Sequence, residues 1–75
     1  MSTYEETAMR IIRIQDVINT TGLGRSTIYK YIEAGEFPKP IPLGERAVGW
    51  VESEVHEWLE EKIELRDTMW TSQNS

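Results

Sequence analysis

The sequence predicts a small, mainly α-helical fold in the order helix, turn, helix, β-hairpin, helix, which is a winged helix-turn-helix arrangement. Three observations predict it. A turn containing glycine separates two short segments that have apolar residues at helical spacing. Three prolines and two alternating apolar stretches follow, which favour a hairpin. A longer stretch with apolar residues at i, i+3 and i+4 then predicts the last helix.

The first helix is predicted over Gln15 to Thr21, with Val17 and Ile18 facing the core and Gly22 in the turn. The residues before it, Ile11 to Ile14, are apolar and β-branched. They can either lead into this helix or form a short strand, and the sequence leaves both open.

The second helix is predicted over residues 24–34. Ile28 and Ile32 lie four residues apart and therefore share its buried face. Gly24 is an acceptable but weak N-cap, and Gly35 ends the helix because glycine tolerates the left-handed conformation.

Prolines at 38, 40 and 42 exclude a helix and favour extended backbone, so residues 39–50 are predicted to form a two-stranded hairpin, or wing, whose first strand is an edge strand. The last helix is predicted over residues 52–67, with Ser53 as its N-cap. Residues 1–9 and 68–75 are predicted to be flexible tails around a single domain of residues 10–67. The large aromatic residues are assigned to the core: Phe37, Trp50 and Trp58.

Size and composition exclude several classes of function. A chain of 75 residues makes one small domain, which leaves little room for a deep enzyme pocket. No cysteine is present and His56 is the one histidine, so no metal site or other cofactor is expected. Paired carboxylates are frequent but lie on an exposed helix, and no nucleophile motif occurs, so the chain is not expected to be an enzyme. No apolar run approaches the length of a membrane span and the N-terminus lacks a signal peptide, so we expect a cytoplasmic protein.

The charge is unevenly distributed along the chain. The formal net charge is -5, but residues 10–50 contain six bases and four acids. Residues 51–75 contain two bases and seven acids, so the acidity lies mostly on the last helix. The middle of the chain is mildly basic and could meet phosphates, while the acidic last helix could repel DNA or contact a protein partner.

The exposed positions of the second helix carry side chains that suit nucleic acid. They are Arg25, Ser26, Thr27, Tyr29 and Lys30. Arginine can bind guanine through O6 and N7, and hydroxyl groups can bind bases or phosphates. On an isolated helix Arg25 and Lys30 would be ordinary solvated surface. Ser26 and Thr27 could instead bind first-turn amides, and Tyr29 could pack against the core.

Two further basic residues lie in the predicted wing. Lys39 and Arg46 suit contacts to phosphates, which position a protein without reading sequence, although Arg46 could also serve solubility alone. Together with the second helix, these basic residues predict binding to double-stranded DNA. The basic residues are few, so the affinity of one copy should be modest, and paired or cooperative binding of several copies would compensate.

The run from Gly22 to Leu59 resembles the AlpA family of phage-derived transcriptional regulators. The resemblance rests on four pieces of sequence: STIY at 26–29, GEFPKP at 35–40, LG followed by VGW within 43–50, and SEV followed by WL within 53–59. The family is similar to excisionases and to MerR-type DNA-binding domains. It usually has serine at the place of Gly24, so the helix cap here departs from the pattern.

The resemblance implies a winged helix-turn-helix protein with its second helix in the major groove and its wing on the backbone or minor groove. It implies regulation of prophage or integrative-element genes, with an integrase or RNA polymerase as a further partner. Two alternatives stay open. One is an architectural, excisionase-like factor that bends attachment-site DNA beside an integrase. The other is a protein-interaction module such as an antirepressor.

Overall fold

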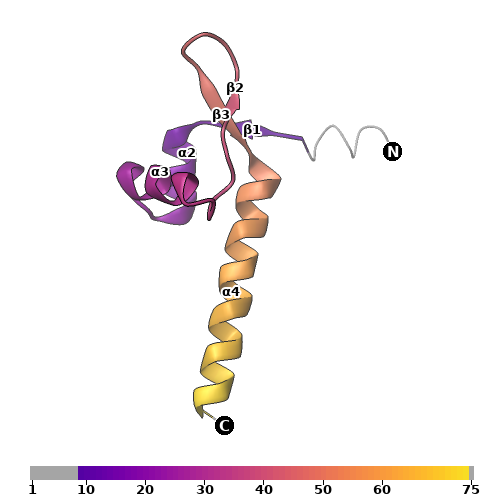
Figure 1. The fold of residues 1–75 in the computed structure, drawn as a ribbon. Coiled ribbons are helices and arrows are strands. Elements are labelled where there is room, and N and C mark those ends of the chain that lie inside the picture. Colours follow the sequence, from indigo (N-terminus) through magenta and orange to yellow (C-terminus); the bar gives the residue numbers. More distant parts are fainter. Residues whose placement is uncertain (1–8, 75) are drawn as a thin grey trace, which may run out of the picture.

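The computed structural model describes residues 9–74, and side chains up to residue 70. It has the predicted winged helix-turn-helix fold, with a short strand ahead of the first helix (Figure 1). The elements in order are β1 (Ile11–Ile12), α2 (Ile14–Thr21), α3 (Arg25–Glu33), β2 (Ile41–Pro42), β3 (Val48–Val51) and α4 (Glu52–Asn74). The predicted N-terminal tail, residues 1–9, lies outside the described residues except for Met9.

The short helix α2 is held at both ends by local hydrogen bonds. At its start, the backbone N–H of Arg13 donates to the Asp16 carboxylate over 3.2 Å. At its end, Gly22 adopts a φ of 79° and donates its N–H to the carbonyl of Ile18 over 2.8 Å. This is the left-handed conformation for which glycine is favoured, and the predicted turn residue is confirmed.

Helix α3 begins without a side-chain cap after Gly24, whose backbone is extended. It ends in a Schellman motif, in which Gly35 has a φ of 76° and donates to the Ile32 carbonyl over 3.0 Å. The next N–H, from Glu36, donates to the carbonyl of Tyr31 over 2.8 Å. Both predicted helix ends are therefore confirmed, and the motif turns the chain sharply back toward the sheet.

The strands form one antiparallel sheet in the order β1-β3-β2. The hairpin of β2 and β3 was predicted, and Pro42 in β2 lies on an edge strand as expected. The third strand settles the question left open for residues 11–14, because Ile12 pairs with Trp50 and Ile11 with Val51. The wing, defined as residues 39–51, comprises this hairpin and the two residues that lead into it, and it is thus anchored to the start of the domain.

The core lies where the helix pair, the sheet and the start of α4 meet. Its buried residues are Ile12, Val17, Ile28, Phe37, Trp50 and Val55. Two indole N–H groups hold the loop after α3: Trp50 donates to the Pro38 carbonyl over 3.0 Å, and Trp58 to the Glu36 carbonyl over 2.6 Å. The Phe37 ring packs edge-on against Trp58, with centroids 4.8 Å apart. The predicted core positions of the three large aromatic residues are confirmed, with Trp58 half-buried.

Helix α4 differs from its predicted bounds at both ends. It begins at Glu52, directly after β3, so Ser53 lies inside the first turn and is not the N-cap. It continues past the predicted end at Asp67 as far as Asn74, and residues 68–74 are helical where a tail was expected. The physical reason is that no glycine or proline interrupts the chain after residue 51, so no residue stops the helix.

The distal part of α4 projects away from the rest of the protein (Figure 1). The radius of gyration is 14.8 Å, against about 11 Å for a compact domain of this length. We call residues 10–59 the head and residues 60–74 the distal segment.

Among the described residues, no helix combines the length and the apolar character needed to cross a membrane.

Candidate nucleic-acid interface

The turn between α2 and α3 is short and held by a side chain. It comprises Gly22, Leu23 and Gly24. The hydroxyl of Thr21 donates to the Val17 carbonyl over 2.8 Å and accepts the N–H of Leu23 over 3.1 Å. Because Leu23 also packs against the core, the turn fixes the angle at which α3 leaves α2.

Helix α3 has one buried face and one exposed face. Ile28 is fully buried, and Ile32 and Tyr31 pack beside it on the core. Four of the five candidate residues are exposed: Arg25, Ser26, Tyr29 and Lys30. At about 100° per residue they span an arc of about 140°, from Arg25, which lies on the same side of the helix as Ile32, to Lys30, which lies opposite Ile28. Thr27 lies at the edge of this face and is half-buried. The structure therefore brings four candidate residues onto one open surface and turns the fifth partly inward.

Tyr29 packs against the core and remains partly exposed. Its ring stands edge-to-face to the buried ring of Trp50, with centroids 6.3 Å apart and an interplanar angle of 68°. The residue nevertheless keeps 38% of its surface exposed. Tyr29 thus ties α3 to the central strand β3 and still presents part of its surface to solvent.

The wing residues lie on well-anchored backbone. Lys39 is exposed and directly follows Pro38, whose carbonyl accepts the indole N–H of Trp50. Arg46 is exposed in the tip of the hairpin, a three-residue loop closed by a 2.7 Å bond from the Leu43 N–H to the Ala47 carbonyl. Neither side chain makes a hydrogen bond or ion pair with α3 within the described part of the chain.

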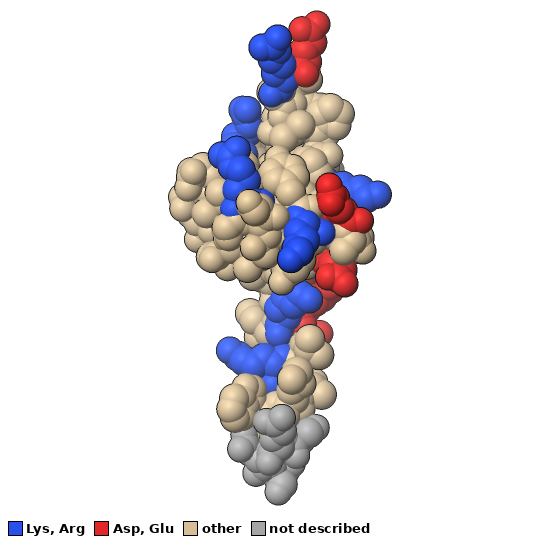
Figure 2. All heavy atoms as spheres, turned by 60° about the vertical axis from the view of Figure 1, so that its left-hand side comes forward, with Lys and Arg blue, Asp and Glu red and all other residues tan. Residues whose placement is uncertain are grey.

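The candidate bases are not neutralised by neighbouring acids. In residues 9–70 the ion pairs are Arg10–Glu52 and Arg66–Asp67, and neither involves α3 or the wing. Figure 2 shows basic side chains spread over the head from the wing down to α4, whereas most acidic side chains in that view gather along one side.

Sequence reasoning gave no role to Arg13, which is exposed at the start of α2, where a backbone phosphate would lie if that helix crossed DNA. Its place just before the first helix was the available signal.

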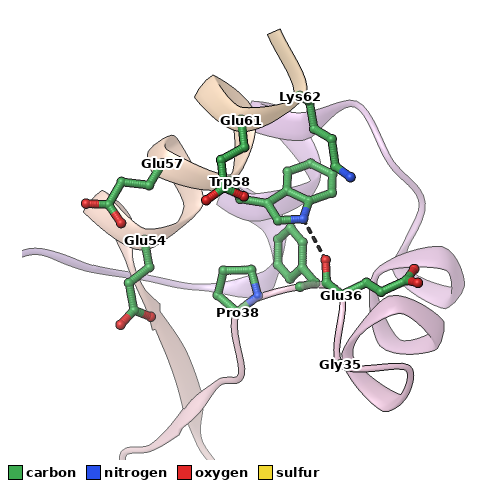
Figure 3. A pocket seen from close by; sticks show the side chains of 9 residues that line it. Gly35, Glu36, Pro38, Glu54, Glu57, Trp58, Glu61 and Lys62 are labelled. Atoms are coloured by element: carbon green, nitrogen blue, oxygen red, sulfur yellow. Dashed lines mark hydrogen bonds between the residues drawn. The ribbon is translucent and has the colours of Figure 1, made fainter. Parts of the chain in front are cut away.

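A groove of ≈ 570 Å³ separates α4 from the loop after α3 (Figure 3). The groove is acidic, whereas the candidate residues on α3 and the wing are basic or neutral. The Trp58 ring lies against Phe37 and Pro38 there, and Lys62 holds its amino group 5.1 Å from the centre of the Trp58 ring. Four carboxylates line the groove: Glu36, Glu54, Glu57 and Glu61. Acids at this density repel phosphate, so the groove is unsuited to binding DNA.

Among the described residues, no group of three or more His, Cys, Asp or Glu side chains is arranged so that it could hold a metal ion. His56 is exposed on α4. The surfaces with distinct chemistry are therefore the polar, basic face of α3, the basic wing and the acidic groove.

Comparison with known proteins points to one family. Residues 10–63 match the family model described as prophage CP4-57 regulatory protein (AlpA). The chain is 41% identical to the DNA-binding transcriptional activator AlpA of Escherichia coli K12, over 77% of this chain and 91% of that protein. It is 44% identical to the uncharacterized protein ORF88 of enterobacteria phage P4, over 76% of this chain and 65% of that protein.

These matches confirm the resemblance on which the sequence analysis drew, and a family of regulatory proteins agrees with the expectation that the chain is not an enzyme. The family model covers the helix-turn-helix, the wing and the first half of α4, which is the part of the chain that builds the common core. With this coverage and this identity, the chain belongs to the AlpA family of prophage regulatory proteins.

Proposed function

We propose that this protein binds specific sites on double-stranded DNA and regulates transcription of genes in a prophage or integrative element. The observation that carries the proposal is the exposed face of α3, which directly follows a turn held by a side chain. This face carries hydroxyl groups and basic side chains, and the basic side chains form no ion pair within residues 9–70. The E. coli relative is named a DNA-binding transcriptional activator, which supports the same function.

In this proposal α3 lies in the major groove with its N-terminal residues against base edges. Helix-turn-helix proteins make most base contacts from this part of the second helix. Arg25 is the residue best suited to a bidentate contact with guanine, and Ser26 can reach a base or a phosphate. Thr27, at the edge of the face, is better placed for the backbone, and Lys30, one turn further on, suits a phosphate.

The wing contributes anchoring contacts in the same proposal. Lys39 and Arg46 bind phosphates or line the minor groove, and their anchored backbone reduces the entropy lost on binding. Tyr29 couples the two elements, because its ring touches Trp50 on β3 while its outer edge remains open to DNA.

The small number of basic side chains sets the expected strength of binding. Each phosphate that a basic side chain neutralises releases counterions, so affinity falls steeply with salt. With about five contacts to phosphate, raising the salt from 50 to 200 mM should weaken binding by roughly 500-fold. The acids of the chain, which lie mainly on α4, add long-range repulsion and make a tight complex with one copy unexpected.

The direct test is a titration of the purified protein against labelled duplexes at several salt concentrations. The duplexes are the regions upstream of neighbouring genes, the attachment site of the element and a shuffled control of equal length. Specific binding predicts a tighter complex with at least one natural duplex than with the shuffled one. Absence of any complex at low salt would overturn the proposal.

The same duplexes separate regulation from an architectural role. A reporter driven by the bound upstream region should change its expression when the protein is present, and activation is the direction indicated by the name of the E. coli relative. A strong bend in attachment-site DNA, measured by circular permutation of the site, with no effect on the reporter, would instead favour the excisionase-like alternative.

A further inference from the structure

The distal segment of α4 carries large apolar side chains that no part of the described chain covers. Ile63, Met69 and Trp70 are 48%, 52% and 57% exposed. Ile63 and Trp70 are seven residues apart and therefore share one side of the helix, whereas Met69 lies about 100–120° away from them and Leu65 lies on the opposite side. We call Ile63 and Trp70 the apolar stripe. It lies beyond the head, where no other described element returns to pack against it (Figure 1).

The two margins of the stripe have opposite charge. At 100° per residue, Lys62 lies on one margin together with Met69, and Glu60 and Asp67 lie on the other. This is the arrangement of a heptad with Ile63 and Trp70 at a, Lys62 at g and Asp67 at e. Within the described residues, Lys62 has no acid within ion-pair distance. The helix therefore offers an apolar strip with a basic and an acidic edge.

Opposite edges of this kind are complementary to a second copy of the same helix in one orientation. When two identical helices run parallel, the g edge of one faces the e edge of the other, so Lys62 meets Asp67 of the second copy, and the reverse pair forms on the other side. In an antiparallel pair, like edges meet, and the acidic edge carrying Glu60 and Asp67 would lie against itself. Charge therefore favours the parallel orientation.

We propose that the distal segments of two copies pair in parallel through the apolar stripe. The pairing places two heads at the same end of the assembly, so that two copies of α3 are presented together. Arg66 lies in the same strip and would face its counterpart in the second copy, with its charge partly offset by Asp67 of its own chain, 2.8 Å away. A short strip with one charged layer gives a weak dimer, with a Kd between about 1 μM and 1 mM.

The proposal does not depend on the function proposed above, and it is tested without DNA. Sedimentation equilibrium of the full chain should show a reversible monomer–dimer equilibrium in that concentration range. Ile63→Glu should weaken self-association at least about tenfold, because it places a charge in the centre of the strip. Leu65→Glu is the matched control: Leu65 is 54% exposed but lies on the other side of the helix, so the dimer should be unaffected.

Circular dichroism of each variant verifies that the helix remains, which glutamate at an exposed position favours. A chain that stays monomeric up to about 1 mM overturns the proposal. A dimer that Ile63→Glu leaves intact, or that Leu65→Glu weakens equally, also overturns it, since the contact would then lie elsewhere.

The orientation is tested by mixing two charge variants. Lys62→Glu and Asp67→Lys should each weaken the homodimer, because like charges then face each other across both edges. In a parallel heterodimer of the two variants, the introduced glutamate of one chain faces the introduced lysine of the other. On the opposite edge the retained Asp67 faces the retained Lys62, so the mixture should associate more tightly than either variant alone. If mixing restores nothing, the parallel pairing is wrong.

Discussion

The head and the distal segment of α4 are built from similar residues but differ in what surrounds them. In the head, turns bring two helices, three strands and the start of α4 back onto one core, and Val17, Ile28 and Trp50 are fully buried. In the distal segment every residue from 60 to 70 is exposed. An apolar side chain stabilises a fold only if another element covers it, so Trp50 stabilises the domain whereas Trp70 remains available for a partner.

The two regions also divide the charge. The head presents bases on α3 and the wing that form no ion pair within residues 9–70, while six acids crowd the exposed sides of α4 from residue 54 onward. A net charge of -5 is therefore compatible with a DNA-binding surface, because phosphates meet one face and not the average of the molecule. The predictions below test this division, from the largest expected effect to the smallest.

Trp50→Ala should be the most damaging substitution. It empties the largest fully buried position, removes the bond to the Pro38 carbonyl and costs about 3–5 kcal/mol. A core of this size supplies only about 3–5 kcal/mol in total, so the variant should be largely unfolded at 25 °C by circular dichroism. Leu65→Ala in the distal segment is the control and should shift stability by no more than about 0.5 kcal/mol. Equal effects of the two would refute the contrast between head and distal segment.

Gly49→Ala should weaken the sheet. A Cβ at this position would lie 2.5 Å from the Cγ2 of Ile11 and 3.1 Å from the Ile12 carbonyl oxygen, so β1 would have to move away from β3. We expect a loss of about 1–3 kcal/mol in urea unfolding. Gly44→Ala is the control, because a Cβ there meets no atom within 4 Å. An unchanged midpoint for Gly49→Ala would mean that the pairing of β1 does not contribute to stability.

Arg25→Ala should change which DNA is bound without changing the fold. If Arg25 contacts guanine with both nitrogens, its loss should cost about 1–3 kcal/mol on the specific duplex and little on the shuffled one. Fluorescence anisotropy with both duplexes measures the difference. A uniform loss on both would assign Arg25 to phosphate anchoring, and the assignment of a base-reading role would be wrong.

Lys39→Ala should weaken binding to all sequences alike. Removal of one phosphate contact lowers the slope of log K against log salt by about one. Glu64→Gln, which changes the net charge by one unit in the opposite direction on the exposed distal segment, is the control and should leave the slope unchanged. A change in slope of similar size but opposite sign for Glu64→Gln would show that net charge, and not the wing, governs binding.

Gly24→Ser should have the smallest effect, a gain of a few tenths of a kcal/mol in the free energy of unfolding. The backbone at this N-cap is already extended and nothing lies within 4 Å of the added Cβ, so a serine hydroxyl can bind the first-turn amides of α3. Thermal unfolding measures the gain. A loss of stability would mean that Gly24 is required for a reason other than capping.

The helix-turn-helix was predictable because its signals are local. Gly22 and Gly35 stop helices through their own backbone preferences, and the four-residue spacing of Ile28 and Ile32 marks the buried face of α3 without reference to other elements. The same spacing places Ser26 and Lys30 opposite Ile28, whereas Arg25 shares a side with Ile32 and is exposed in the first turn of α3. The end of α4 was misjudged because polar composition does not end a helix that contains no glycine or proline.

By itself, the sequence therefore determined the order of the elements, the ends of α3, the edge position of β2 and the separation of basic from acidic segments, since each depends on neighbouring residues. Only the tertiary structure decided that residues 11–12 become a strand, that Tyr29 packs against Trp50, and that the two indole groups hold the loop after α3. It also decided which part of α4 is covered. The physical reason is that these contacts join residues distant in the chain, and their free energy exists only when the whole head has assembled.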